Sequence, residues 1–204
     1  MATRMSEYQG LCNDQDSEWS SILCQTVNGQ RSLATDVALS LTPSGQACET
    51  YIHGDVKSEN LFTTQDGTKA AFFDFQYVGL GLGVCDLAKL FTCSVPLEML
   101  VDDPDSVPHE LAMGAGEKQL LELYRTTLLE GGSRTYPWEL FKLHWETALV
   151  DWLRFQASWG FWGNTEWLEA RVRSICKDEG WRSWVADLDG MANGRSFAED
   201  RPNA

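Results

Sequence analysis

The second half of the chain carries a helical pattern of apolar residues. Along WELFKLHWETALVDWLRFQASW (138–159), large apolar side chains recur every three or four residues, so they fall on one face of a helix. The segments 116–132 and 165–180 are also helical in pattern, and the first ends in two glycines, as helices often do. This half is therefore predicted to be a helical bundle. The apolar stripe of the longest helix consists of Phe141, Trp145, Leu149, Trp152, Phe155 and Trp159.

The first half alternates short apolar runs with turn residues. Residues 1–20 are polar and are expected to form a loose terminus. Residues 21–50 hold the runs SILCQTV and DVALSLT, which fit two short strands or one helix and one strand. The segments 60–64 (NLFTT) and 69–75 (KAAFFDF) are strand-like, and the Asp-Gly pair at 66–67 is typical of a tight turn. A β-hairpin is therefore predicted here.

Two further segments follow the hairpin. The run GLGLG (79–83) lacks the glycine spacing and the preceding strand of a phosphate-binding loop, so it is predicted to be a flexible loop. Residues 85–92 (CDLAKLFT) are predicted to form a helix that begins at Asp86, a residue type that often caps helices. A loop rich in Asp and Pro (102–108) separates this helix from the helical half, and a polar tail is expected over 190–204.

Composition narrows the class of protein. The net charge of −14 argues against a nucleic-acid partner and is compatible with a small cationic ligand. No apolar run approaches the roughly 20 residues of a membrane-spanning helix, and the first residues lack the apolar core of a secretory signal. Six scattered cysteines without a C-x-x-C pair fit free thiols. We expect a cytoplasmic protein without a membrane partner.

The predicted hairpin gathers three oxygen-bearing side chains. Asn60 and Asp74 lie seven residues before and after Gly67, so antiparallel pairing about the turn places them side by side. Asp55 precedes Asn60 by five residues, on the loop that enters the first strand. Such ligands suit Mg²⁺, which takes one or two protein carboxylates and fills its shell with water and phosphate oxygens. Asp55 is placed to accept a proton from an alcohol, and Lys57 to offset the charge of a phosphoryl group.

The motif residues resemble a known family. HGDVKSENLF (53–62), followed by FFDFQYVGLGLGVCDLAKL (72–90), resembles the aminoglycoside phosphotransferase and choline kinase-like family of small-molecule kinases. The resemblance implies an α+β fold over 21–189: a protein-kinase-like C-terminal lobe, mainly helical, in which a small β-hairpin carries the catalytic loop. It also implies ATP and Mg²⁺ as cofactors and a small-molecule acceptor.

The resemblance also assigns roles to residues. It implies that Asp55 is the catalytic base and that Asn60 and Asp74 hold Mg²⁺. It implies that His53 and Asp86 support the loop. Lys57 follows the protein-kinase form of the motif more closely than the form common in aminoglycoside kinases. Protein kinases themselves are disfavoured, because only eleven residues separate Asp74 from Asp86 and DFQ replaces DFG.

A possible acceptor pocket lies in the aromatic segment DWLRFQASWGFWGN. Eight of the nine tryptophans follow Pro137, and most are expected in the core. In the resembled family the acceptor binds against these helices. Asp151, Trp159 and Trp162 are therefore candidates for a wall that binds an amine-containing acceptor.

The part of a kinase that covers ATP is not evident in the sequence. A Gly-rich loop and a strand lysine are expected before the catalytic loop. The 52 residues before His53 contain three widely spaced glycines and no lysine. The leading hypothesis is a phosphotransferase that moves the γ-phosphate of ATP to an alcohol, and the alternative is a pseudokinase or binding module. Metal-dependent phosphate-ester hydrolysis is weaker, because ligands for a second metal are missing.

Overall fold

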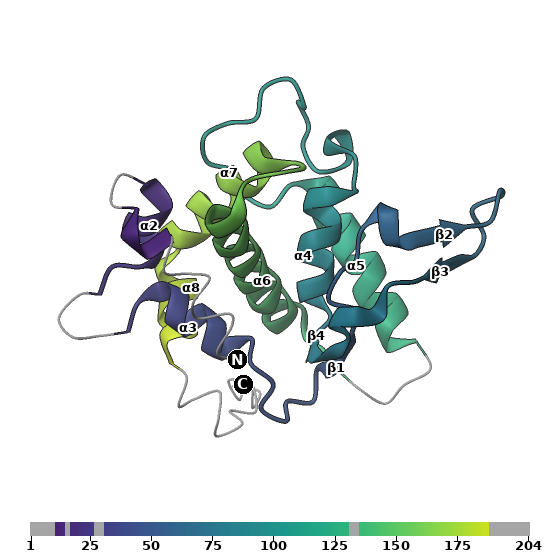
Figure 1. Cartoon of the computed structure of the whole chain (residues 1–204), viewed down its shortest axis with the longest axis horizontal. Coiled ribbons are helices and arrows are strands. Elements are labelled where there is room, and N and C mark those ends of the chain that lie inside the picture. The colour runs from purple at the N-terminus through teal and green to yellow at the C-terminus, as the bar shows by residue number, and fades with distance from the viewer. Residues whose placement is uncertain (1–10, 15–16, 27–30, 131–134, 188–204) are drawn as a thin grey trace, which may run out of the picture.

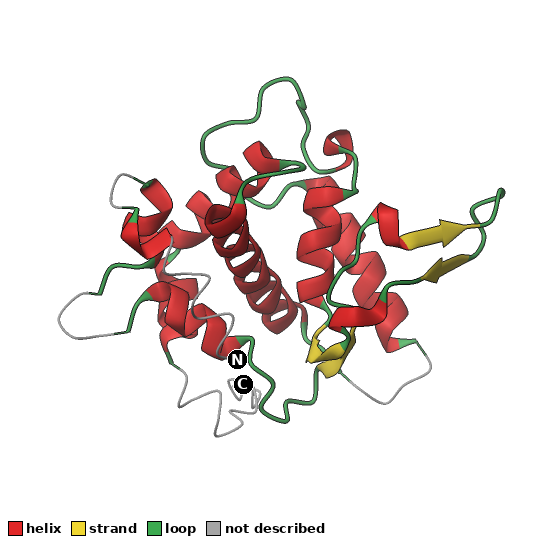
Figure 2. Cartoon of the chain, in the orientation of Figure 1, coloured by secondary structure: helices red, strands yellow, loops and turns green. Residues whose placement is uncertain are grey.

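The computed structural model describes residues 11–14, 17–26, 31–130 and 135–187. Helices make up most of it, and the strands are short (Figure 2). The α-helices are α2 (Glu18–Leu23), α3 (Leu33–Ser40), α4 (Val84–Cys93), α5 (Ala115–Leu129), α6 (Trp138–Trp159), α7 (Thr165–Lys177) and α8 (Glu179–Ala186). The strands are β1 (Glu49–Ile52), β2 (Leu61–Thr63), β3 (Ala70–Phe72) and β4 (Gly79–Leu82), and single 3-10 turns are η1 (Ser58–Asn60), η2 (Phe75–Tyr77) and η3 (Leu97–Met99).

The long helix α6 lies at the centre of the molecule (Figure 1). It packs against α3, α4 and α7, and its bounds are those that the apolar pattern predicts. Phe141, Trp145 and Leu149 are completely buried, as expected for one face of a helix at the centre of a bundle. Trp159, at the end of the same stripe, is 64% exposed. The stripe is therefore core in its first half and surface at its end.

Helix α4 joins the bundle to the segment that precedes it. Its buried residues include Leu87, Ala88 and Phe91, which share one face of the helix. The ring of Phe91 meets the ring of Trp145 edge-on, with centroids 5.0 Å apart. Aromatic contacts of this kind add to the free energy of burial. The packing of this face fixes the position of α4, and with it the residues on the opposite side of the helix.

The strands form two separate antiparallel pairs. β1 pairs with β4, with Glu49 opposite Leu82 and Ile52 opposite Gly79. β2 pairs with β3 in the predicted hairpin, which projects from the body of the molecule (Figure 1). The run GLGLG therefore forms a strand and not the predicted flexible loop. Its glycines fit because β1 lies close: a Cβ on Gly81 would come within 2.8 Å of Ile52 Cδ1.

Several local predictions need correction. Both apolar runs between residues 21 and 50 contribute to helices, α2 and α3, because each packs an apolar face on the bundle. The segment predicted as a loose terminus contains Leu11 and Trp19, which are both buried in the core. The helix predicted over 165–180 is divided into α7 and α8, because the Asp178 carboxylate accepts a hydrogen bond from Trp181 N–H and starts a new helix. The predicted tail over 190–204 lies outside the described residues.

Among the helices that the structure describes, none has the length and apolar character required to cross a membrane. The predicted loop over 102–108 is confirmed as irregular chain between η3 and α5. The observed architecture is thus a mixed fold of helices with two small antiparallel sheets, in which the helical part supports a short β-rich segment.

Candidate active site

The hairpin places Asn60 and Asp74 near each other, but not in the predicted register. Leu61 is opposite Phe72, so Asn60 is opposite Phe73, whose N–H donates to Asn60 O at 3.1 Å. The centre of the turn lies between Asp66 and Gly67 and not at Gly67, which shifts the pairing by one residue. Asp74 is therefore the first residue beyond the Asn60–Phe73 pair.

Asp74 also has an unusual backbone conformation. Its φ of 63° and ψ of 59° lie in the left-handed region, and among the described residues it is the one non-glycine with positive φ. Such a conformation costs a non-glycine residue about 1 kcal/mol or more and is common at functional sites. It ends the extended strand and places the Asp74 side chain beside the loop that holds Asp55.

The loop before Asn60 is held by two side chains. The carboxylate of Asp86 accepts hydrogen bonds from the backbone N–H groups of His53 and Gly54, at 2.7 and 2.8 Å. His53 Nδ1 accepts from Asp55 N–H at 3.2 Å, so its Nε2 carries the proton and donates to Phe73 O at 2.8 Å. Burial raises the pKa of Asp86 above its usual value, although the two N–H groups oppose this. His53 and Asp86 therefore both hold the backbone of this loop in the structure.

The predicted cap at Asp86 is wrong. Helix α4 begins at Val84, and Asp86 lies in its first turn and does not cap it. Its carboxylate turns instead to the loop that holds His53 and Gly54. Gly54 is required in that loop, because its φ is +80° and a Cβ would lie 2.5 Å from Tyr77 O.

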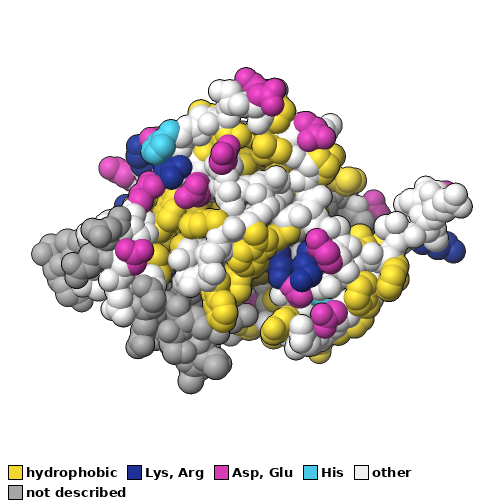
Figure 3. Space-filling view, turned by 45° about the horizontal axis from the view of Figure 1, so that its top comes forward, with side chains coloured by type: hydrophobic (Ala, Val, Ile, Leu, Met, Phe, Trp, Pro, Cys, Tyr) yellow, Lys and Arg dark blue, Asp and Glu magenta, His cyan; other side chains and the backbone are white. Residues whose placement is uncertain are grey.

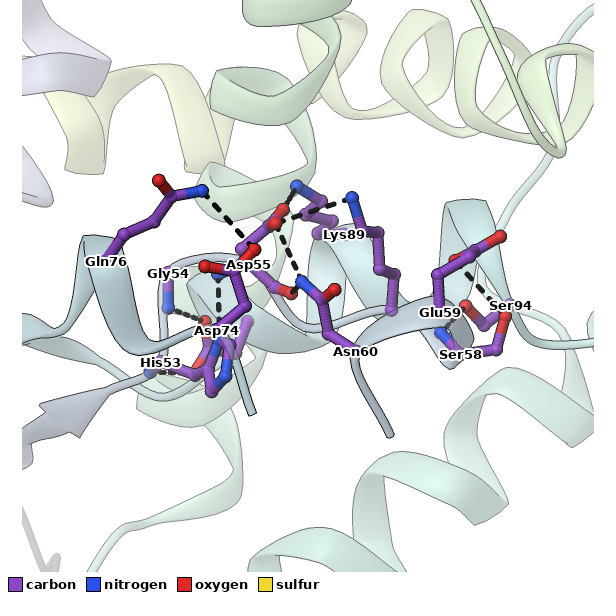
Figure 4. A network of polar contacts seen from close by, with 12 residues as sticks. His53, Gly54, Asp55, Ser58, Glu59, Asn60, Asp74, Gln76, Lys89 and Ser94 are labelled. Carbon is purple, nitrogen blue, oxygen red and sulfur yellow. Dashed lines mark hydrogen bonds and ion pairs between the residues drawn. The ribbon is translucent and has the colours of Figure 1, made fainter. Parts of the chain in front are cut away.

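Asp55 lies at the centre of the polar network, and Asn60 and Lys89 converge on it (Figure 4). Asn60 Nδ2 donates to the Asp55 backbone carbonyl at 2.9 Å and to Asp55 Oδ2 at 2.8 Å. Lys89 Nζ donates to Asp55 Oδ1, and Lys57 Nζ lies 3.4 Å from Oδ2. Burial alone raises the pKa of Asp55, but Lys89, Asn60 and Lys57 together outweigh it and lower that pKa below its usual value. Asp55 is therefore a buried, ionised carboxylate.

Sequence reasoning missed Lys89. Lys89 follows Asp86 by three residues in α4, so both side chains lie on the same side of the helix, facing the loop. Its Nζ also lies 5.2 Å from the centre of the Trp152 ring. In the segment CDLAKL, only Asp86 was predicted to belong to the site. The three-residue spacing between Asp86 and Lys89, which places both on one side of a helix, was the feature that could have indicated Lys89.

The comparison with family models agrees with this arrangement. A model described as "Phosphotransferase enzyme family" matches residues 29–185. The chain belongs to this phosphotransferase family. No curated protein and no solved structure matches the chain. The matched region contains the whole polar network from His53 to Lys89, so the resemblance inferred from the motifs is confirmed.

Phosphotransferases of this family generally use ATP and Mg²⁺, and two residues suit the metal. Asn60 uses its amide nitrogen toward Asp55, which leaves its Oδ1 without a protein donor among the described residues. The Asp74 carboxylate is exposed and receives one long hydrogen bond, 3.4 Å from Gln76 Nε2. Within the described residues, no three His, Cys, Asp or Glu side chains cluster as a metal site. An amide and one carboxylate fit Mg²⁺, which takes its other oxygens from water and phosphate.

The residues predicted for an acceptor pocket lie in and near an aromatic group that Lys89 contacts through Trp152. Trp152, Phe155, Trp159 and Trp162 form one aromatic group, in which Trp152 meets Trp162 edge-on at 5.7 Å and Phe155 stacks on Trp159 at 6.3 Å. Trp159 and Trp162 are both exposed. Asp151 is engaged in an ion pair with Arg154. The aromatic part of the predicted wall thus exists, but its carboxylate already has a cationic partner.

A further feature of the site was not predicted. We call residues 51–80 the site segment. Many of its large apolar side chains are exposed, and hydrophobic side chains gather at the base of the projecting hairpin (Figure 3). They are Tyr51, Phe62, Phe72, Phe73, Phe75, Tyr77, Val78 and Leu80.

Proposed function

We propose that this protein transfers the γ-phosphoryl group of ATP to the hydroxyl of a small molecule, on a protein-kinase-like C-terminal lobe. The observation that carries this proposal is the buried, ionised carboxylate of Asp55. It lies between Asn60 and two lysines, on a loop fixed by His53 and Asp86. Membership of the phosphotransferase family supports the reaction class.

Asp55 orients the acceptor hydroxyl and takes its proton. The hydroxyl oxygen forms a bond to the γ-phosphorus, the bond from that phosphorus to the β-γ bridging oxygen breaks, and ADP leaves with the bridging oxygen's electron pair. A carboxylate with a lowered pKa is a weak base, so its main contribution is position. This suits phosphoryl transfer, in which little charge develops on the attacking oxygen.

Asn60 and Asp74 are proposed to hold Mg²⁺, which neutralises phosphate charge when it is bound. Asn60 then has two functions, because its nitrogen fixes Asp55 while its oxygen faces the metal. Lys57, whose side chain is 34% exposed, is free enough to turn from Asp55 Oδ2 toward a phosphoryl oxygen.

A second candidate is a binding module that performs no transfer. It is favoured by the exposed apolar side chains of the site segment, which are typical of surfaces that bind a partner.

One pair of variants tests the proposed reaction. We expect Asp55→Asn to lower ATP-dependent transfer to an alcohol by roughly 10²- to 10⁴-fold, the usual contribution of a positioned acid–base group. Glu59→Gln is the control, because it neutralises an exposed carboxylate in the same loop. Turnover of Asp55→Asn within a factor of two or so of wild type contradicts the role of Asp55.

A binding measurement separates the two candidate functions. A phosphotransferase with a working metal site should melt at a higher temperature with Mg²⁺ and a non-hydrolysable ATP analogue, and Asp74→Asn should lose that shift. No shift in the wild-type protein at millimolar nucleotide favours the binding module.

A further inference from the structure

The Lys89 ammonium group occupies the place where a cationic acceptor would be expected. It contacts Asp55, and its Nζ also lies 5.2 Å from the centre of the Trp152 ring. A carboxylate on one side and an aromatic face on the other are the two features that recognise a ligand ammonium group. Here the chain fills that position with its own side chain, which is only 15% exposed.

The four aspartates described above for the site each have a partner or an assigned role. Asp55 has Lys57 as a second cation, 3.4 Å from Oδ2. Asp151, the carboxylate beside the aromatic group, pairs with Arg154. Asp86 is occupied by the N–H groups of His53 and Gly54. Asp74 is the carboxylate assigned to Mg²⁺.

We propose that Lys89 is a specificity-determining residue that excludes ammonium groups from the position next to Asp55, so that the acceptor is a neutral or anionic alcohol. This inference rests on the proposed function and defines its substrate class. An ammonium group placed next to the reacting hydroxyl would lie within a few ångströms of Lys89. Repulsion between two like charges at that distance, near a protein surface, weakens binding by roughly tenfold or more.

The same charge favours acceptors with a carboxylate or phosphate. Two ammonium groups, those of Lys57 and Lys89, already lie against the Asp55 carboxylate, so an anionic group of the acceptor has cationic partners next to the reacting hydroxyl. The aromatic residues and the acidic composition pointed to an amine-containing acceptor. We propose an acceptor alcohol that is neutral or carries a carboxylate or phosphate instead.

Three small alcohols of similar size test the proposal: glycerol, its amine analogue serinol and its carboxylate analogue glycerate. Binding to the full chain is measured at neutral pH by ligand-observed NMR titration, without nucleotide. We expect wild type to bind serinol at least roughly tenfold more weakly than glycerol, and glycerate at least as tightly as glycerol. In Lys89→Met, serinol should bind at least roughly tenfold more tightly than in wild type, because Asp55 then lacks its closest cation.

Matched variants control for folding and for loss of any lysine. Lys89→Gln removes the charge but keeps a hydrogen-bond donor, and it should behave like Lys89→Met; Lys89→Arg keeps the charge and should behave like wild type. Lys118→Met is the control, because Lys118 also lies over a tryptophan, 5.7 Å from the ring of Trp138, but does not contact Asp55. Circular dichroism establishes that each variant is folded.

Two results overturn the proposal: wild type binds serinol as tightly as glycerol, or serinol binding does not strengthen in the folded Lys89→Met or Lys89→Gln protein. Because no nucleotide is present, these outcomes do not depend on phosphoryl transfer. The transfer assay with Asp55→Asn can contradict the proposed reaction while the binding preference holds. Equally, the binding preference can be absent while the transfer assay supports the reaction.

Discussion

The helical bundle and the site each contain a buried carboxylate paired with cations, and the two are built differently. In the bundle, Arg171 Nε lies 3.1 and 2.9 Å from the two oxygens of Glu117, and Trp145 Nε1 donates to the same carboxylate at 2.8 Å. Glu117 is 0% exposed. In the site, Asp55 is held by lysines, one of which is a third exposed.

The two arrangements suit different roles, stability for the bundle pair and function for the site. The Glu117–Arg171 pair is enclosed by packed side chains, so neither partner can leave without exposing a buried charge. Lys57 has a flexible, partly exposed stem and can turn from Asp55 toward a ligand without disturbing the core. The bundle is expected to determine the free energy of unfolding, and the site segment to determine activity.

The variant with the largest expected effect on stability is Glu117→Ala. It leaves the Arg171 charge buried without its closest partner, so we expect the free energy of unfolding to fall by about 3–5 kcal/mol. Urea denaturation measures this loss. Glu122→Ala, which removes the exposed Lys118–Glu122 pair, should cost less than about 1 kcal/mol. Equal losses in the two variants would contradict the assigned role of the buried pair.

The second test uses pH and His144, which is buried in the bundle beside Tyr136, Cys48 and Trp184. Burial lowers the pKa of His144 from 6.5 to about 4. Between these two pH values the unfolded chain binds a proton that the native protein does not bind, so stability is fully present above pH 6.5 and falls as the pH drops. At pH 4, protonation of His144 in the unfolded chain should lower the free energy of unfolding by about 3 kcal/mol relative to its value above pH 6.5.

Denaturation at several pH values measures this dependence in wild type and in His144→Phe, which lacks the titrating group and should lose that part of the slope. His109→Gln, at an exposed histidine, should keep it. The same slope in all three proteins would show that His144 is not the source.

Gly54→Ala tests whether the site segment depends on the geometry of its loop. The new Cβ would lie 2.5 Å from Tyr77 O, so we expect a loss of about 2 kcal/mol and a displaced Asp55 with little transfer activity. Gly67→Ala is a matched control, because its φ is +68° but nothing lies within 4 Å of its Cβ. It should cost about 1 kcal/mol and leave activity intact. If the two variants behave alike, close packing at Gly54 is unimportant.

The smallest expected effect is that of Phe62→Ser. Phe62 is 66% exposed, and its ring stacks on Phe73 at 4.7 Å. Loss of this surface contact should change the free energy of unfolding by less than about 0.5 kcal/mol, measured by urea denaturation. A loss of several kcal/mol would mean that the site segment contributes to stability in the way the bundle does.

The sequence predicted the bundle and the hairpin because both follow from local patterns. The bounds of α6 follow from a periodic stripe, and the hairpin from an Asp-Gly turn between apolar runs. The one-residue shift of Asn60 could not be predicted, since it depends on where the turn is centred. Lys89 was missed because its role depends on the packing of α4 against the loop, which brings residues 34 positions apart into contact.

The pairing of β1 with β4 has a consequence for how such a site changes during evolution. Ile52 and Gly79 are opposite each other, so the intervening chain leaves the molecule and returns at neighbouring points. A segment with adjacent ends can be lengthened, shortened or exchanged at a small entropic cost, because the closure of a loop depends only weakly on its length. The loop and hairpin can therefore change in length or sequence while the helices beneath them, including helix α4, which carries Lys89, keep their packing.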